Sequence, residues 1–153
     1  MTEIWKQIDW IPNLRGSYEV SNLGNIRRTS LFWRNPYTGE LTERFKTRNI
    51  KAHDNGHGYL YVVFVLDSDK GRKLTTFYVH RLVAQAFVAN LDNKPEVNHK
   101  NFVRTDNQAV NLEWVSSLEN MKHSTTMDRR LKIHYPQPKK SKKKKGCDTQ
   151  GEP

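Results

Sequence analysis

The sequence predicts an α+β fold in which short antiparallel strands and a β-hairpin precede a compact unit of strand, loop, strand and helix. The clearest signal is Y-L-Y-V-V-F-V-L at residues 59–66 and L-T-T-F-Y-V at 74–79, which flank the turn signal D-S-D-K-G-R. A second signal is V-N-H at 97–99 and N-L-E-W-V at 111–115, separated by a polar loop. We expect the hairpin to be a scaffold and the second unit to carry the chemistry.

The N-terminal part predicts only short elements. Residues 3–30 alternate turn signals with short apolar runs, in which Tyr18, Val20 and Ile26 could face a small core. The segment 31–58 is polar and contains proline and glycines. We expect a loop there, with at most one further strand near Leu41–Phe45, and we place no chemistry in it.

Two helices are predicted. Residues 81–88 carry apolar side chains at helical spacing, which predicts a short helix with one face packed on the hairpin. Ser116, with Glu119 three residues later, forms a capping-box pattern, so a second helix should begin there. This helix would carry Asn120 and His123 on neighbouring faces.

The charge balance favours a polyanionic partner. The 153 residues include 26 Lys and Arg against 16 Asp and Glu, which gives a formal net charge of +10. Such a surface suits binding to phosphates, although a basic protein with a charged tail explains the composition equally well. The single cysteine, Cys147, excludes an intrachain disulfide and a multi-cysteine zinc site. No apolar run is long enough for a membrane span, so we expect no membrane partner.

The composition divides the chain into three parts. We expect a module of short strands at 1–50, the hairpin with the strand, loop, strand and helix unit at 51–130, and a disordered basic tail at 131–153. The lysine run at 139–145 would add salt-sensitive affinity for nucleic acid, and it also resembles a nuclear localisation signal.

Four ordered motifs carry a family resemblance. They are V-H-R-L-V-A-Q-A-F from residue 79, V-N-H from 97, N-L-E-W-V from 111 and E-N-M-K-H from 119. They resemble the HNH homing endonucleases of phages and introns, which use a ββα-metal nuclease core. I-W-K-Q-I and Y-E-V-S-N-L-G-N-I-R-R resemble the short module that often precedes this core. The resemblance implies that the module at 1–50 contacts DNA and that 51–130 contains the hairpin and the HNH nuclease core. The resemblance implies a metal-dependent endonuclease that nicks or cuts double-stranded DNA in the cytoplasm of a phage-infected or bacterial host cell.

The resemblance places the catalytic residues at His99 and Asn111. His99 would be the general base, because a neutral imidazole with a pKa near ~6.5 can deprotonate water at neutral pH. Asn111 occupies the place of the residue that orients the base in the family. Asn111 could instead bridge the loop through backbone hydrogen bonds, and the two roles are compatible.

The metal ligands implied by the resemblance are Asn98 and Asn120, with His123 as a further candidate. The amide oxygens of Asn98 and Asn120 suit Mg²⁺ or Mn²⁺. Some relatives have Asp or His at the position of Asn98. Two neutral amides should hold a cation weakly until a DNA phosphate adds negative charge. Many relatives also read D-G-N where this chain has N-F-V at 101–103, a change that could alter the loop and impair cleavage.

Basic residues supply the expected DNA contacts, although each alone is more often a solvated surface charge. The candidates are Arg27, Arg28, Arg34, Arg81, Lys100, Arg104 and Lys122. The oligomeric state is left open, and a partner protein could supply specificity.

Two other classes of protein remain compatible with the sequence. A non-catalytic DNA-binding protein that retains the HNH fold would explain the two neutral amides and the missing D-G-N. A basic RNA-binding protein would explain the charge but not the order of the motifs.

Overall fold

The computed structural model describes residues 2–123 and has the predicted α+β architecture, with mostly antiparallel strands and few helices. The predicted tail, its lysine run and Cys147 lie outside the described residues. Across residues 2–123, no helix is long and apolar enough to cross a membrane.

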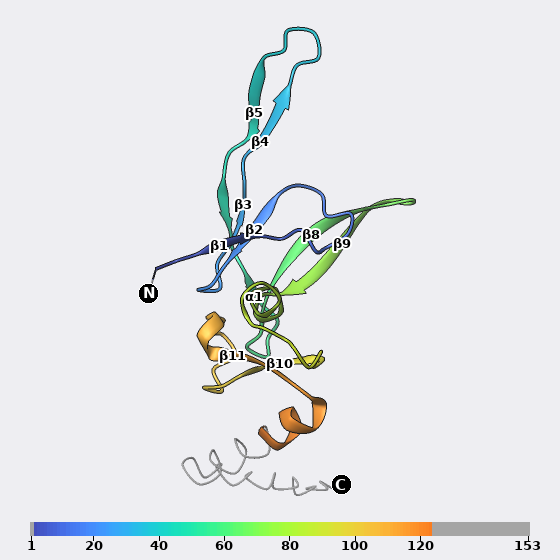
Figure 1. Ribbon diagram of the computed structural model, residues 1–153. Coiled ribbons are helices and arrows are strands. Elements are labelled where there is room, and N and C mark those ends of the chain that lie inside the picture. Colours follow the sequence, from blue (N-terminus) through green and yellow to red (C-terminus); the bar gives the residue numbers. More distant parts are fainter. Residues whose placement is uncertain (1, 124–153) are drawn as a thin grey trace, which may run out of the picture.

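The N-terminal part forms a four-stranded antiparallel sheet and a separate hairpin. The sheet has the order β1-β2-β3-β6, and the hairpin pairs β4 with β5 and projects away from the rest of the molecule (Figure 1). The expected loop at 31–58 is therefore wrong where β4 and β6 form strands, and the strand near Leu41–Phe45 is confirmed. The bounds are β1 Trp5–Gln7, β2 Tyr18–Ser21, β3 Ile26–Arg28, β4 Leu31–Arg34, β5 Leu41–Phe45 and β6 Arg48–Ile50.

The predicted hairpin is confirmed as β8 Leu60–Ser68 and β9 Gly71–Tyr78, with the short β7 His53–Asp54 added at the β8 edge. Val62 and Phe64 on β8 are buried, whereas Val63 between them is exposed. The residues at the outer end of the hairpin are exposed as well. One face of the hairpin therefore packs on the core, as expected for a half-buried strand pair.

The first predicted helix is α1 Val79–Phe87, which follows β9 directly and lies at the centre of the molecule (Figure 1). Two side chains from distant strands bind its C-terminal carbonyl groups. Lys6 Nζ donates to Ala86 O at 2.7 Å, and Trp114 Nε1 donates to Val88 O at 3.1 Å. These bonds satisfy carbonyl groups that a helix end leaves unpaired.

The predicted strand, loop, strand and helix are all present. β10 Glu96–His99 pairs antiparallel with β11 Leu112–Val115, after a loop that ends in the 3₁₀ turn Ala109–Asn111. Residues 117–123 are helical. The capping box is confirmed, because Ser116 N donates to Glu119 Oε2 at 2.7 Å and Glu119 N donates to Ser116 Oγ at 3.3 Å.

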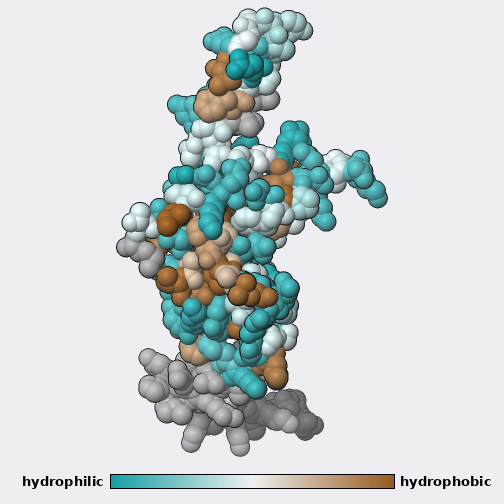
Figure 2. Space-filling model, viewed as in Figure 1, coloured by the Kyte–Doolittle hydropathy of each residue, from teal (hydrophilic) through white to brown (hydrophobic). Residues whose placement is uncertain are grey.

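One hydrophobic core joins these parts. Side chains from the N-terminal sheet, the hairpin, α1 and the β10–β11 pair contact one another in a single cluster. In Figure 2 the hydrophobic residues gather over the middle of the molecule, while hydrophilic residues cover the outer end of β8–β9. The N-terminal strands are therefore fixed against the β10–β11 unit. The buried members are Ile8, Tyr18, Val20, Ile26, Val62, Phe64, Val79, Leu82, Val83, Ala84, Val97 and Leu112.

Candidate active site

His99 is the last residue of β10 and lies opposite Leu112 of β11. It is 5% exposed, and its ring packs against the rings of His80 and Tyr59, at centroid distances of 5.2 and 6.2 Å. The strand and these two rings hold the imidazole in a defined orientation.

Asn107 fixes which nitrogen of His99 carries the proton. His99 Nε2 lies 3.1 Å from Asn107 Oδ1. An amide oxygen can only accept a hydrogen bond, so Nε2 must carry the hydrogen in this contact. The Asn107 amide is itself oriented by a weak bond from its Nδ2 to Thr105 O at 3.4 Å. In the neutral imidazole the lone pair is then on Nδ1, which leaves that atom able to accept a proton.

The surroundings of His99 favour its neutral form. Burial lowers the pKa of the imidazole below its ordinary value of 6.5, and the positive charge of Arg104 acts in the same direction. The hydrogen bond to Asn107 and the carboxylate of Asp106 oppose this shift. At neutral pH the ring is therefore mostly uncharged and competent as a base.

Asn111 does not make the expected contact with the His99 ring. Its Oδ1 accepts from Asn101 N at 3.0 Å, and its Nδ2 donates to Asp106 O at 2.8 Å. Asn111 therefore takes the alternative role of bridging the loop through backbone hydrogen bonds. The contact with the His99 ring that was expected of Asn111 is made by Asn107, four residues earlier.

The three candidate metal ligands lie together. Asn98, Asn120 and His123 all line a pocket of about 50 Å³, which His99 also lines. This volume suits a cation or a few water molecules and is far too small for a nucleotide. The structure therefore brings the predicted base and the predicted ligands to one place.

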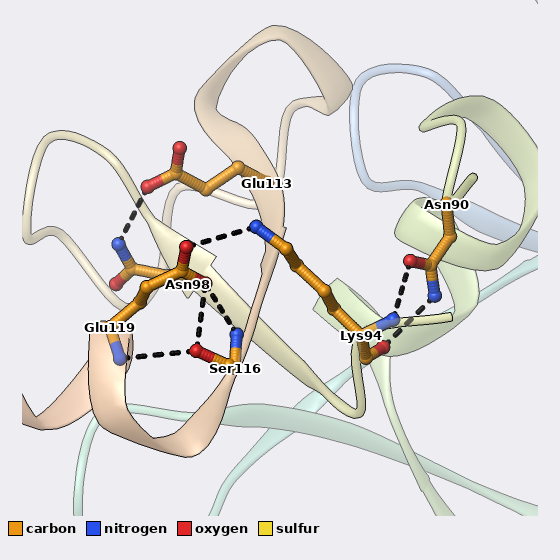
Figure 3. A network of polar contacts seen from close by, with 6 residues as sticks. All are labelled: Asn90, Lys94, Asn98, Glu113, Ser116 and Glu119. Atoms are coloured by element: carbon orange, nitrogen blue, oxygen red, sulfur yellow. Dashed lines mark hydrogen bonds and ion pairs between the residues drawn. The ribbon is translucent and has the colours of Figure 1, made fainter. Parts of the chain in front are cut away.

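Each of the two asparagines is bonded to a carboxylate. Asn98 Nδ2 donates to Glu113 Oε1 at 2.8 Å, across the β10–β11 pair (Figure 3). Asn120 Nδ2 donates to Glu96 Oε2. Hydrogen bonds from Ser117 and Asn120 lower the pKa of Glu96, so this carboxyl group is ionised at neutral pH. The network in Figure 3 also holds the start of the last helix, through an ion pair of 3.0 Å between Lys94 Nζ and Glu119 Oε1.

The loop that lacks D-G-N keeps a left-handed residue at its centre. Phe102 has φ +64°, a conformation that costs a non-glycine residue roughly 1–2 kcal/mol. Its ring stacks on the ring of His123, with the centroids 3.9 Å apart. Asn101 supports the turn, because its Oδ1 accepts from Val103 N at 2.8 Å and its Nδ2 donates to Asp106 Oδ2 at 2.7 Å. The altered sequence therefore still makes a tight turn, and it adds a contact to the candidate ligand His123.

The donors of the pocket fit a hard divalent cation only in part. Two amide oxygens and one imidazole can bind Mg²⁺ or Mn²⁺, but none of them carries a negative charge. Among residues 2–123, there is no group of three or more His, Cys, Asp or Glu side chains placed to hold a metal ion. A cation in this pocket would therefore need additional oxygen ligands, such as those of a phosphate.

The predicted DNA-contacting residues fall into two groups. Arg104 and Lys122 lie at the site: Arg104 lines the pocket with its guanidinium over the Tyr59 ring, and Lys122 lines an adjacent hollow that also contains Asn98. Arg81 donates to Pro95 O and Lys100 donates to Val110 O, so both are close to β10. The remaining three, Arg27 and Arg28 on β3 and Arg34 on β4, belong to the N-terminal part.

Residues of the N-terminal turn also support the site. Ala109 N donates to Asn22 O at 2.8 Å, which joins the loop before β11 to the turn after β2. Gly24, at φ +89°, packs so closely that an added Cβ would be 3.0 Å from Asn107 Cβ. This side of the active-site loop therefore rests on the N-terminal module.

Sequence reasoning missed Asn107, Glu96 and Glu113. Glu113 belongs to the motif N-L-E-W-V, but its partner Asn98 is defined only by the pairing of β10 with β11. Asn107 follows Asp106 in a polar loop, and asparagine is common in such loops because it favours turns, so its presence there did not indicate a contact with His99.

Comparison with known proteins assigns the family. Residues 77–122 match the model of the HNH endonuclease, and residues 3–65 match that of the NUMOD4 motif. The chain belongs to the HNH endonuclease family. The recognition made from its motifs is thereby confirmed, including the module that precedes the HNH unit.

The relatives of this HNH protein include viral and phage enzymes. Two uncharacterized HNH endonucleases of Acanthamoeba polyphaga mimivirus are 37% and 33% identical, over 80% and 82% of this chain but only 26% and 31% of their own length. The DNA endonuclease I-HmuI of Bacillus phage SP01 is 29% identical over 78% of this chain and 56% of its own. The chain thus spans between about a quarter and about half of these relatives.

A solved structure of the HNH homing endonuclease I-HmuI, which concerns DNA binding and cleavage, has the same fold. The TM-score is 0.55 at 25% identity, over 86% of this chain and 67% of that chain. The similarity therefore includes both the N-terminal strands and the HNH unit.

Proposed function

We propose that this protein is a metal-dependent endonuclease that hydrolyses phosphodiester bonds of double-stranded DNA. The observation that carries the proposal is the contact between His99 Nε2 and Asn107 Oδ1, because it leaves Nδ1 as the proton acceptor beside a pocket of oxygen donors. The name of the relative I-HmuI, a homing endonuclease, supports the same class of reaction.

His99 acts as the general base in this proposal. Its Nδ1 removes a proton from a water molecule, and the hydrogen bond from Nε2 to Asn107 holds the ring while positive charge develops on it. Asn111 keeps the loop closed around this pair through its two backbone contacts. Burial keeps His99 unprotonated before the reaction.

Asn98, Asn120 and His123 are the residues that would hold the divalent cation, Mg²⁺ or Mn²⁺. When bound, the cation would stabilise negative charge on the phosphate and on the leaving oxygen. Arg104 lines the same pocket and would contact a phosphate oxygen with its guanidinium.

The N-terminal module would bind the DNA on either side of the cut. Arg27, Arg28 and Arg34 lie on β3 and β4, and the β4–β5 hairpin extends well beyond the core (Figure 1). Arg34 is the one of the three that lies on this extension, where a positive side chain suits contact with a phosphate backbone, whereas Arg27 and Arg28 lie on the four-stranded sheet. The similarity to an endonuclease of a Bacillus phage supports a role in a phage-infected or bacterial cell.

The test is a cleavage assay on supercoiled plasmid with a series of divalent metals, comparing the full chain with His99→Ala and His53→Ala. His53 is an exposed histidine on β7, so its variant controls for loss of an imidazole elsewhere. We expect cutting by the wild type and by His53→Ala, and its loss in His99→Ala. Nicked and linear products are resolved on the same gel and separate single-strand from double-strand cutting. Cutting that survives in His99→Ala would refute the assignment of the base.

A second candidate function is DNA binding without cleavage. It is favoured by the neutral donors of the pocket and by the absence of an acidic or histidine cluster within residues 2–123. Duplex binding in a mobility-shift assay, combined with no cutting in any metal, would select this function. A preference for structured RNA over duplex DNA would instead indicate an RNA-binding protein.

A further inference from the structure

Two carboxylates stand directly behind the neutral donors of the pocket. Glu113 accepts from Asn98 Nδ2, and Glu96 accepts from Asn120 Nδ2. The two pairs come from different elements, because Asn98 and Glu113 face each other across β10–β11, whereas Asn120 lies in the helical segment 117–123. The same arrangement therefore occurs twice around one pocket.

These contacts determine which way each amide is turned. A carboxylate can only accept hydrogen bonds, so the NH₂ group of Asn98 must face Glu113. The reverse orientation would bring two oxygens to the 2.8 Å that separates the bonded atoms. With Nδ2 engaged, Oδ1 at the other corner of the planar group is left for another partner. The same reasoning applies to Asn120 and Glu96.

A bond from an amide to an ionised carboxylate also changes the amide oxygen. Hydrogen bonds to charged groups are stronger than neutral ones, and linked hydrogen bonds polarise one another. The NH₂ group that donates to a carboxylate makes Oδ1 of the same amide more negative. A polarised and fixed Oδ1 is a better ligand for a hard cation than the oxygen of a freely rotating amide.

We propose that Glu113 and Glu96 are positioning residues that orient Asn98 Oδ1 and Asn120 Oδ1 toward the divalent cation. This inference rests on the proposed function, because it assumes that the pocket binds the cation used for cleavage. The site then consists of two carboxylate–amide pairs instead of two isolated neutral ligands. Neither carboxylate needs to touch the cation.

Binding of Mn²⁺ to the protein–DNA complex tests the role of Glu113 independently of activity. The signal of free Mn²⁺ in electron paramagnetic resonance is titrated with complex, and the binding of Mn²⁺ to DNA alone is subtracted. We expect Glu113→Ala to weaken Mn²⁺ binding roughly tenfold or more, as is usual for loss of a group that orients a metal ligand. Glu113→Gln should retain most of the affinity, because the Gln Oε1 can still accept from Asn98. Asp69→Asn, which removes one negative charge from the exposed turn between β8 and β9, is the matched control and should bind as the wild type does.

A double-mutant cycle distinguishes orientation from direct ligation. If Glu113 acts through Asn98, Glu113→Ala should have no further effect on Mn²⁺ affinity in an Asn98→Ala background. An equal loss in both backgrounds would overturn the inference, since Glu113 would then act on the cation directly. The same cycle applies to Glu96 and Asn120, and thermal unfolding of each variant identifies any loss of the fold.

The result for the wild type separates this inference from the proposed function. A wild type that binds Mn²⁺ and cuts DNA, together with unaffected Glu113→Ala and Glu96→Ala variants, would overturn the positioning role alone. A wild type that neither binds Mn²⁺ in the complex nor cuts would overturn the proposed function, and the positioning role with it.

Discussion

His80 gives a prediction about stability that can be worked out from its surroundings. It is 6% exposed, it packs against the rings of Tyr59, Tyr78 and His99, and its buried Nδ1 has no hydrogen-bond partner among residues 2–123. Burial, with smaller effects from His99 when it is protonated in acid and from the positive charge of Arg81, lowers the pKa of His80 from 6.5 to about 3. The ring is therefore neutral in the folded protein at neutral pH and must stay neutral for the fold to persist in mild acid.

The size of the effect follows from proton linkage. Between pH 6.5 and about 3 the unfolded chain binds a proton at His80 and the folded chain does not, so the free energy of unfolding falls as the pH falls. Above pH 6.5 the titration of His80 does not change the free energy of unfolding. Between pH 6.5 and about 3, each pH unit of acidification lowers this free energy by about 1.4 kcal/mol. Lowering the pH from 7 to 5 should therefore cost the wild type about 2 kcal/mol through His80 alone. His80→Phe keeps a ring in the same space and removes the proton-binding site.

Urea unfolding followed by circular dichroism at pH 7 and pH 5 measures this difference. We expect the free energy of unfolding to fall by about 2 kcal/mol less in His80→Phe than in the wild type. His53→Phe, at an exposed position on β7, serves as control and should keep the wild-type dependence on pH. Equal losses in the wild type and in His80→Phe would refute the reasoning, because the acid sensitivity would then come from other groups.

The loop around His99 gives three further predictions. Asn107→Ala should slow single-turnover cutting about 100-fold, because the His99 ring is no longer held in place, and the affinity for duplex DNA in a mobility-shift assay should not change. Asn107→Asp should retain most of the rate but move the acid limb of the pH–rate profile to higher pH, since the added negative charge raises the pKa of His99. Gly24→Ala introduces a Cβ at φ +89° and 3.0 Å from Asn107, so it should lower both the melting temperature and the cutting rate; unchanged cutting would show that the N-terminal turn does not position the loop. Phe102→Gly should relieve strain of roughly 1 kcal/mol but release His123, leaving urea stability within about 1 kcal/mol of wild type while weakening Mn²⁺ binding to the protein–DNA complex.

The parts of the fold that the sequence predicted correctly depend on local patterns. The β8–β9 hairpin follows from two runs of β-branched and aromatic residues around a turn, and α1 follows from helical spacing of apolar residues. The capping box of Ser116 and Glu119 is local as well. In each case the residues that determine the element are within a few positions of one another.

The β4–β5 hairpin was not predicted because it does not pack on the core. Phe32 and Trp33 of β4 and Leu41 of β5 remain about half exposed, so burial imposes no alternation of apolar and polar residues on these strands. The hairpin is held by cross-strand pairing instead, which a one-dimensional pattern does not show.

The partners of the site residues were not predicted because they depend on register and on long-range packing. Whether Glu113 faces Asn98 depends on a register that a shift of one residue would destroy. Asn107 reaches His99 only because the loop is closed by Asn111 and supported by the turn at Asn22. In contrast, motif order and the family resemblance proposed His99 as the base and Asn98, Asn120 and His123 as the metal ligands, and the structure brings these four residues to one pocket.

The pairing of Asn98 with Glu113 also gives a physical reason for the amide at this position. An aspartate at 98 would place its carboxylate next to that of Glu113, at the distance now spanned by a hydrogen bond of 2.8 Å. Two unit charges about 4 Å apart repel by roughly 1 kcal/mol in water and about 4 kcal/mol near a protein surface. The amide of Asn98 avoids this repulsion and still offers an oxygen donor to the pocket. The negative charge is on Glu113, which binds the amide from behind. The absence of a carboxylate among the candidate ligands therefore does not make the site electrically neutral: in this chain the charge belongs to the residues that hold the ligands.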